Sequence, residues 1–438
     1  MTAQSAVQGT RRYLGQFRGF SRPIDLFLMA VFLGTLSQQI ALLYLNFYLL
    51  ALGRDAAFIG LFNAVPNVLT LLVGLPVGAI SDRIGPRRAL IVGTLIQLAA
   101  VTGLILSSDP WLLLGWVALQ GVGTAFTWAN GGPFMMIHSR PEQRNAVFSL
   151  QQALGNFTGF LGNLLAGYVP LGIVLLVGGS ADSLPALRGT LWLAAAVLGL
   201  SLLPLLPIPE TKREAPAAPV GPAGGARPLR PRLFTNPGLV LRLLLPGTLI
   251  GFGAGMTMPV LNLFIKGRFG VDYGELGLVF ALAAVGTMVA TLLQPLLADH
   301  VGRVRSTVIV QVLSLPFLMI MGFLPIFPLV VLALVVRGAL MNMGNPIFTA
   351  FSMEQIPVAE RARFSSLSTM LWSGGWAVGS AFSGWWRGLV GFDTGFNTAF
   401  ALMAGFYVSS FVLLWWWFDR PEAAARRAAR ALPGASGI

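Results

Sequence analysis

The sequence contains no cysteine, and charged residues are scarce for its length. Without cysteine the chain can form no disulfide, no thiolate metal site and no cysteine nucleophile. Charged residues make up 10% of the 438 residues and hydrophobic residues 55%, whereas soluble domains average about 25% charged residues. A soluble protein of this size could not cover its surface with so few charges, because Lys, Arg, Asp and Glu normally lie outside. The composition therefore predicts that lipid is the main solvent.

Acidic residues and histidine are also few: the chain has 16 Asp and Glu and 2 His, against 29 Lys and Arg. A net charge of +13 would favour a nucleic-acid partner. The basic residues, however, lie in short segments between apolar runs and follow the positive-inside bias of membrane proteins. We therefore expect no nucleic-acid partner, and we expect both chain ends to face the cytoplasm. The sequence shows no convergent set of acids, histidines or nucleophiles, so we expect no enzyme, no metal and no cofactor.

Twelve apolar stretches are each long enough to cross a bilayer as a helix, which takes about 20 residues. In lipid, backbone amides must be satisfied within their own segment, so these stretches are expected to be helices. We predict an all-α polytopic membrane protein that crosses the cell (inner or plasma) membrane many times. The predicted helices cover about 24–50, 57–80, 89–107, 111–137, 145–170, 188–207, 240–265, 274–297, 306–324, 327–352, 364–386 and 397–418.

Composition divides the chain into five segments, with six predicted helices on either side of a polar connection. Residues 208–236 are rich in proline, glycine, alanine and charge, which is typical of a linker that cannot bury apolar area. The full prediction is a cytoplasmic N-terminal segment at 1–23, a six-helix bundle at 24–207, a cytoplasmic linker at 208–236, a second six-helix bundle at 237–418 and a basic cytoplasmic tail at 419–438.

A short motif occurs once in each half and indicates an internal duplication. Residues 78–88 read GAISDRIGPRR and residues 295–305 read PLLADHVGRVR, so that Asp299 follows Asp82 by 217 positions. Asn262 follows Asn46 by 216 positions, which supports nearly the same offset. Two pseudo-symmetric bundles of six helices each are therefore expected.

The first copy of this motif resembles the signature between the second and third helices of the major facilitator superfamily. Gly78, Asp82, Arg83, Gly85, Arg87 and Arg88 fit it, and Asp299, Gly302 and Arg303 remain in the second copy. The resemblance implies the twelve-helix fold of that family, secondary transport by alternating access, and a conformational latch formed by these nine residues. Val117 and Phe160 depart from the pattern of the members that exchange drugs for protons, so direction and coupling stay open.

Amide side chains within the apolar spans are the first candidates for a substrate site, because polar groups in lipid are costly. They concentrate on predicted helices that line the central cavity in the resembled fold, whereas the four peripheral helices hold only Gln97 and Gln311 within their spans and Asn397 at an end. For each amide the alternative role is a hydrogen bond between helices. The candidates are Gln39, Asn46, Asn63, Asn130, Gln152, Asn156, Asn262 and Asn342.

Arg337 is the charged residue placed deepest in a predicted span, and no acidic residue precedes Glu354 within that span. A buried arginine needs acceptors. One hypothesis is that Arg337 binds an anionic solute, and the other is that nearby amides such as Asn342 and Asn345 satisfy it. Trp372 and Trp376 share one face of the eleventh predicted helix, where they would either stack on a ring or acyl chain of the solute or anchor the helix.

These features predict a secondary transporter, for efflux or uptake, that moves a small organic solute by alternating access through a central, amide-rich cavity. One form of this hypothesis is an anionic solute that binds to Arg337. The alternative is an exporter or flippase of an amphiphile, a drug or a lipid, which the 11 Trp and 30 Phe would suit. A more distant alternative is a membrane sensor that does not transport. The expected partners are the solute and the lipid bilayer, and a monomer is expected because the duplicated fold is complete in one chain.

Overall fold

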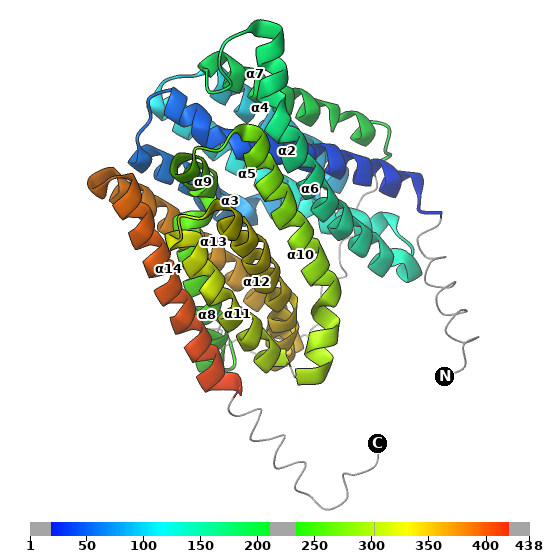
Figure 1. Cartoon of the computed structure of the whole chain (residues 1–438). Coiled ribbons are helices and arrows are strands. Elements are labelled where there is room, and N and C mark those ends of the chain that lie inside the picture. The colour runs from blue at the N-terminus through cyan, green and yellow to red at the C-terminus, as the bar shows by residue number, and fades with distance from the viewer. Residues whose placement is uncertain (1–18, 211–233, 302, 420–438) are drawn as a thin grey trace, which may run out of the picture. The chain divides into compact units, whose positions relative to one another are not determined.

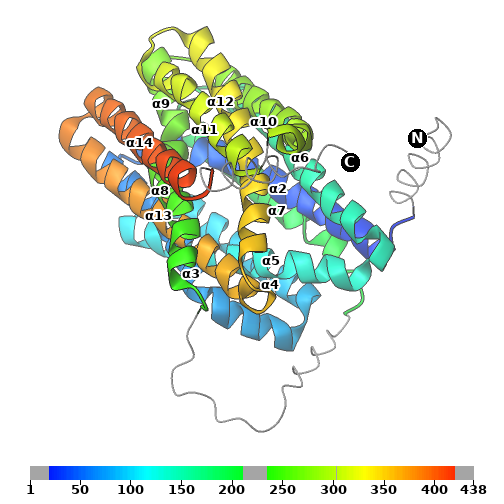
Figure 2. The ribbon, with the colours of Figure 1, turned by 90° about the horizontal axis from the view of Figure 1, so that it is seen from below.

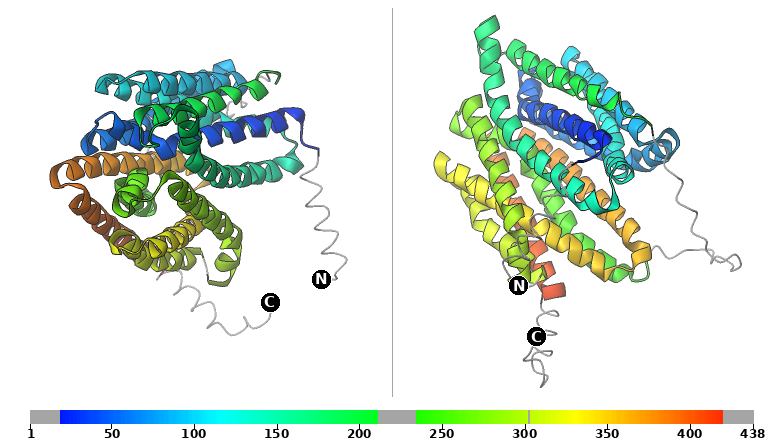
Figure 3. Two further views of the ribbon diagram at one scale, coloured as in Figure 1. Left: turned by 45° about the horizontal axis from the view of Figure 1, so that its top comes forward. Right: turned by 90° about the vertical axis from the view of Figure 1, so that its right-hand side faces the viewer.

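The computed structural model describes residues 19–210, 234–301 and 303–419. Most of the segments predicted as N-terminal extension, linker and basic tail lie outside this part. The described residues fold into long helices without a strand, which confirms the predicted all-α fold (Figure 1). Eleven helices are long and apolar enough to cross a membrane, and Figure 3 shows the described chain from two further sides.

Contacts divide the chain into two compact units. Residues 1–54, 65–225 and 271–281 belong to unit 1, and residues 55–64, 226–270 and 282–438 belong to unit 2. The helices of unit 1 are α2 (Arg22–Ala51), most of α3 (Ala56–Ile84), α4 (Pro86–Leu106), α5 (Pro110–His138), α6 (Arg144–Val177) and α7 (Leu184–Leu200), with 3-10 turns η1 (Pro141–Gln143) and η2 (Leu203–Leu205). Unit 2 contains α8 (Pro237–Thr257), η3 (Met258–Val260), α9 (Leu261–Phe269), most of α10 (Tyr273–Val301), α11 (Arg303–Phe323), α12 (Phe327–Gln355), η4 (Val358–Glu360), α13 (Arg361–Val390), α14 (Phe392–Leu414) and the π-turn η5 (Trp415–Asp419).

The helices within each unit repeat one packing pattern. In unit 1, α2 packs on α6 and α7, and α4 packs on α5 and α7. In unit 2, α8 packs on α13 and α14, and α11 packs on α12 and α14. The first helix of each half therefore contacts the fifth and sixth, and the third contacts the fourth and sixth, as an internal duplication predicts.

The first residues of α3 and of α10 belong to a different unit from the rest of the same helix. The start of α3 packs within unit 2, and the start of α10 packs within unit 1. Gly60, near the start of α3, accepts a hydrogen bond at its carbonyl oxygen from Ser380 Oγ at 3.2 Å. Tyr273, which begins α10, donates its hydroxyl to Asp182 Oδ1 at 2.7 Å and lies against the ring of Tyr44. These contacts explain why the units differ from the two halves of the sequence.

The helix predicted at about 240–265 is broken in the structure. It forms α8, the 3-10 turn η3 and the short helix α9. Pro259 lies in the turn, and proline removes a backbone N–H and clashes with the preceding turn of a helix. The break is therefore a local consequence of one residue.

Helix α13 is the one predicted span that is absent from the eleven apolar helices. It has 30 residues, enough to cross a bilayer, but its sequence RARFSSLSTMLWSGGWAVGSAFSGWWRGLV is rich in serine and glycine. Because small polar residues lower its hydropathy, α13 must be held by its neighbours as well as by lipid. It packs on α8 along its length, and the two helices lie side by side in Figure 2.

Glycine allows this close packing of α8 and α13. Gly251 and Gly255 of α8 are four residues apart, as are Gly375 and Gly379 of α13. A Cβ atom added to Gly251 would lie 2.9 Å from the carbonyl oxygen of Trp372, and one added to Gly379 would collide with the carbonyl oxygen of Phe252. Small residues at this spacing bring helix backbones together in membranes.

We expect Gly375→Ala to destabilise unit 2 by about 1–3 kcal/mol relative to Gly374→Ala. The Cβ added at Gly375 would lie 2.9 Å from the carbonyl oxygen of Thr248, whereas the one added at Gly374 would meet no atom within 4 Å. Both changes raise helix propensity equally, so the contrast isolates the packing. Thermal unfolding of the two purified variants measures it, and equal midpoints would contradict close contact of α8 with α13.

Candidate functional site

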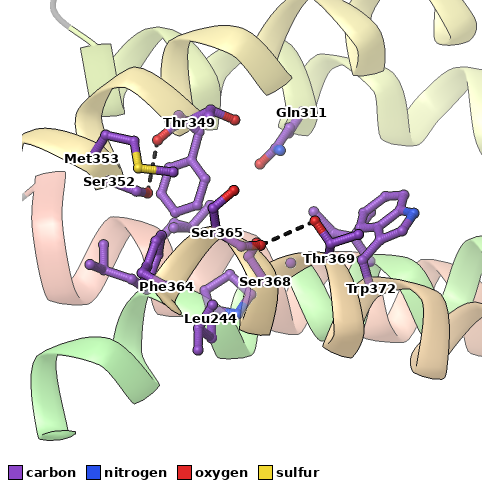
Figure 4. Close-up of a pocket in the computed structure, with 16 residues that line it drawn as sticks. Leu244, Gln311, Thr349, Ser352, Met353, Phe364, Ser365, Ser368, Thr369 and Trp372 are labelled. Carbon is purple, nitrogen blue, oxygen red and sulfur yellow. Dashed lines mark hydrogen bonds between the residues drawn. The ribbon is translucent and has the colours of Figure 1, made fainter. Parts of the chain in front are cut away.

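A cavity of about 320 Å³ lies within unit 2, where α8, α11, α12 and α13 meet (Figure 4). Hydroxyl and amide groups face aromatic and aliphatic side chains in it. None of its 16 lining residues is charged. Its polar lining consists of Gln311, Thr349, Ser352, Ser365, Ser368 and Thr369, and its apolar lining includes Leu243, Leu244, Ile250, Phe348, Met353, Phe364, Trp372 and Leu414.

Helix α13 supplies one wall of this cavity. Ser365, Ser368, Thr369 and Trp372 are spaced by three, one and three residues, so they share one face of the helix. The hydroxyl of Thr369 donates to the carbonyl oxygen of Ser365 at 3.1 Å within the helix, whereas Ser365 and Ser368 are exposed. The serines that lower the hydropathy of α13 therefore include residues of the cavity wall.

Gln311 of α11 is a buried residue of this lining whose side-chain oxygen accepts no hydrogen bond from the described residues. Its exposed fraction is 3%, and among the described atoms its Oε1 has no hydrogen-bond partner. Figure 4 shows the amide oxygen directed toward the side of the cavity where Ser365 lies. A molecule in the cavity could donate a hydrogen bond to this oxygen.

A second cavity, of about 540 Å³, lies within unit 1 among α2, α4, α5, α6 and α7. None of the described residues that line it is charged. Gln97 Nε2 donates to Thr127 Oγ1 at 3.2 Å in its wall, and Phe27, Trp128 and Phe148 supply aromatic rings. Its polar residues are Thr35, Gln38, Thr94, Gln97, Thr127, Gln151, Gln152 and Ser201.

The two cavities occupy equivalent places in the internal repeat. Each is lined by the first, third, fourth, fifth and sixth helices of its half. At the offset of 217 positions, Gln311 corresponds to Thr94, and Ser314 corresponds to Gln97. An amide and a hydroxyl have therefore exchanged places between the two copies, while both sites have kept an uncharged polar lining.

Two of the predicted substrate residues, Gln152 and Trp372, line these cavities. Trp376 is in neither lining, and its ring centroid lies 6.5 Å from that of Trp372. Ser365, Ser368 and Gln311 were not among the candidates. The low hydropathy of the eleventh span and the isolated glutamine in the ninth were the sequence signals that could have found them.

Several predicted amides donate hydrogen bonds within the protein, and their contact with a solute stays a prediction. Asn63 donates to the carbonyl oxygen of Ile59 at 2.9 Å, and Asn342 donates to that of Gly338 at 2.8 Å. Asn130 is buried and donates to Ser81 Oγ at 2.8 Å, which joins α5 to α3. These contacts are of the helix-stabilising kind.

The remaining predicted amides lie outside the linings of the two cavities. Asn46 and Asn262 are buried, with exposed fractions of 2% and 5%, and Asn262 Oδ1 accepts from the backbone N–H of Leu263 at 2.9 Å. Gln39 and Asn156 are half-buried. Their contact with a solute stays a prediction.

Arg337 is buried between α12, α14 and η3, with an exposed fraction of 4%. Its Nη2 donates to the hydroxyl of Tyr407 at 3.2 Å, its guanidinium lies 5.5 Å from the centre of that ring, and its Nη1 lies 3.8 Å from Met258 Sδ. Its Nε has no hydrogen-bond partner among the described atoms. Asn342 bonds within its own helix, and the side chain of Asn345 is not described.

The first copy of the signature motif joins the start of α4 to the end of the α7 region within unit 1. Gly85, with φ +88°, precedes α4. Arg87 donates from Nε to the carbonyl oxygen of Leu205 at 3.0 Å and from Nη2 to that of Leu206 at 2.6 Å. The backbone N–H of Arg88 donates to Glu210 Oε2 at 3.1 Å. The motif therefore holds the start of α4 against the residues that follow α7.

The other predicted latch residues are two exposed side chains, a glycine in open space, and residues whose side chains are not described. Asp82 and Arg83 are exposed, and a Cβ added to Gly78 would meet no atom within 4 Å. In the second copy, Asp299 and Arg303 lie in α10 and α11 but their side chains are not described, and Gly302 lies outside the described residues. A latch role for these residues stays a prediction.

Glu210→Ala should destabilise the protein by about 1 kcal/mol, because it removes the acceptor for the Arg88 N–H. The ion pair itself adds little, since the Arg88 side chain is 66% exposed. Glu142→Ala, at an exposed glutamate of η1, is the control and should leave the unfolding midpoint unchanged. Thermal unfolding of both variants decides, and equal losses of stability would show that Glu210 does not tie α4 to the α7 region.

Comparison with known proteins identifies the family. The model of the Major Facilitator Superfamily matches residues 27–252 and 243–435. The chain is 28% identical over 114 residues to the multidrug resistance protein MdtH of Cronobacter sakazakii and 30% identical over 121 residues to that of Citrobacter koseri. These matches cover 25% and 27% of this chain and only 28% and 30% of the relatives' length.

Solved structures show the same fold over nearly the whole chain. The nucleoside transporter NupG superposes with a TM-score of 0.71 at 15% identity, covering 90% of this chain and 98% of its own. A bacterial homologue of the iron transporter ferroportin, in an inward-facing state, gives 0.66 at 15% identity, covering 91% and 99%. The chain is therefore a multi-pass membrane protein that belongs to the Major Facilitator Superfamily of transporters.

Proposed function

We propose that this transporter moves a small, uncharged, polar organic solute by alternating access, with both chain ends on the cytoplasmic side. The observation that carries the proposal is the pair of repeat-related cavities lined by amides, hydroxyls and aromatic rings, without a charged residue. The distribution of basic residues in the short connecting segments supports the orientation.

The lining chemistry favours a neutral solute on energetic grounds. A charged solute that leaves water for a low-dielectric site loses hydration and needs an opposite charge to compensate. Amides and hydroxyls both donate and accept hydrogen bonds, so they can replace the water around an uncharged polar molecule. Aromatic walls, as at Trp372 and Phe364, bury the apolar part of the same molecule.

Neutral solutes should therefore exchange across proteoliposomes in preference to their phosphorylated forms. We would compare counterflow of glucose with glucose phosphate, and of uridine with uridine monophosphate. Because no described residue that lines either cavity is acidic, basic or histidine, the rate should change little between about pH 6 and pH 8, the range in which histidine titrates. Preferred exchange of the phosphorylated forms, or exchange that depends steeply on pH, would contradict the proposal.

An anionic solute is the second candidate, and Arg337 is the observation that favours it. Its guanidinium has neutral neighbours, Tyr407 and Met258, and a nitrogen without a hydrogen-bond partner among the described atoms. A buried arginine in such surroundings can donate hydrogen bonds to a carboxylate or phosphate. The guanidinium does not line either cavity, which is why the neutral solute is preferred.

Substitutions at Arg337 separate the two candidates. If the solute is neutral, Arg337→Lys and Arg337→Gln should both leave the KM for counterflow within about threefold of the wild type, because neither changes the cavity lining. For an anionic solute, Arg337→Lys should keep most of the affinity and Arg337→Gln should lose about tenfold or more, as expected for a charge-assisted hydrogen bond. Unfolding midpoints of both variants control for lost structure.

An amphiphile such as a drug is the third candidate, because the relatives named above are called multidrug resistance proteins. The aromatic residues of the two cavities would suit such a molecule. In the same counterflow assay, exchange of hydrophobic dyes without exchange of glucose or uridine would favour this function over the proposed one.

A further inference from the structure

We propose that the unit 2 cavity selects a hydroxylated ring compound by a hydrogen bond to Gln311, with the ring held against Trp372. This inference rests on the proposed function and names the chemistry of its substrate. The site differs from the predicted central set of amides, because Gln311 belongs to a helix that the resemblance placed at the periphery.

The unpaired oxygen of Gln311 indicates a ligand. A buried amide oxygen without a hydrogen bond is costly in a folded protein, and native structures contain few such groups. Gln311 is 3% exposed, its Oε1 has no partner among the described atoms, and it lines the cavity. The missing partner must be a donor, an O–H or N–H group, because a carbonyl oxygen only accepts hydrogen bonds.

The internal repeat shows that the fold itself does not require this amide. Thr94 is the equivalent residue in unit 1, and its hydroxyl donates to the carbonyl oxygen of Leu90 at 2.9 Å within α4. Gln97, the nearby amide of unit 1, donates to Thr127. The equivalent residue of the other copy therefore makes its hydrogen bond within its own helix. Gln311 Oε1, in contrast, can accept a hydrogen bond from a ligand.

The opposite wall determines the shape of the ligand. Ser365 and Ser368 present exposed hydroxyls, and Trp372 lies two turns after Ser365 on the same face of α13, about 10 Å along the helix. A molecule that touches both must carry polar groups at one end and an apolar ring face at the other. The volume of about 320 Å³ is at the small end of ligand pockets, about 300–1,000 Å³, which fits one or two rings.

Charge excludes the common anionic forms of such compounds from this cavity. Its described lining residues include no Lys, Arg or His to compensate a phosphate or carboxylate, and an unpaired charge in a low-dielectric site is strongly disfavoured. A neutral sugar or nucleoside has the required hydroxyls and ring. Its phosphorylated form should bind much more weakly.

Isothermal titration of the full-length protein in lipid nanodiscs tests this assignment, with glucose and uridine as the neutral probes and their phosphates as charged controls. Gln311→Leu removes the acceptor. Gln311→Thr introduces the residue found at the equivalent position of unit 1, so this variant is expected to fold. Each should weaken binding of the neutral probe by about tenfold, the value of one hydrogen bond. Both should unfold at or above the wild-type temperature without ligand, because an unpaired buried acceptor is lost.

Thr398→Val is the matched control, since its hydroxyl bonds within its own helix and lies outside the cavity. It should bind the probes as the wild type does. Wild-type affinity in both Gln311 variants would overturn the assignment, while wild-type counterflow of the neutral probe would leave the proposed function standing. If the wild-type protein neither binds nor exchanges any neutral probe, the proposed function and this inference both fail.

Discussion

Within a bilayer, a polar side chain must find its hydrogen-bond partner inside the protein, because lipid supplies none. Many hydroxyls of the described helices meet this constraint locally: Thr94, Thr190 and Thr287 each donate to the carbonyl oxygen four residues before. Asn130 meets it between helices, through Ser81. Gln311 and Arg337 are exceptions, since each keeps a buried polar atom that the described protein does not satisfy. The proposed solute site lies at the first of these exceptions, among uncharged side chains.

Small residues make the cavity of unit 2 possible. Gly251 and Gly375 bring the backbones of α8 and α13 so close that a side-chain carbon at either would lie 2.9 Å from a carbonyl oxygen of the other helix. This packing holds α13 in the bundle despite its low hydropathy. The polar residues Ser365 and Ser368 can then line a cavity without the apolar surface that other spans need. On α13, glycine therefore provides the close helix packing and serine provides polar groups in the cavity wall.

The sequence was sufficient for the helical class, the positions of most spans, the duplication and the family, because length, hydropathy and the motif around Asp82 are local features. It could not show which polar residues meet in space. Asn130 shows this, because its hydrogen bond to Ser81 of a different helix follows from the fold and not from any local pattern. Gln311 lies on a helix that the resemblance places at the periphery, yet it lines a cavity. The break at Pro259 is local, but the long apolar run on both sides of it hid the interruption.

The central claim is that an uncharged cavity within unit 2 holds the solute. An experimental density map of the protein in nanodiscs, with whichever neutral probe stabilises it most, tests this directly. The account predicts ligand density among α8, α11, α12 and α13, within hydrogen-bonding distance of Gln311 Oε1 and beside the ring of Trp372. Density against the guanidinium of Arg337, with an empty unit 2 cavity, would contradict it and would favour an anionic solute.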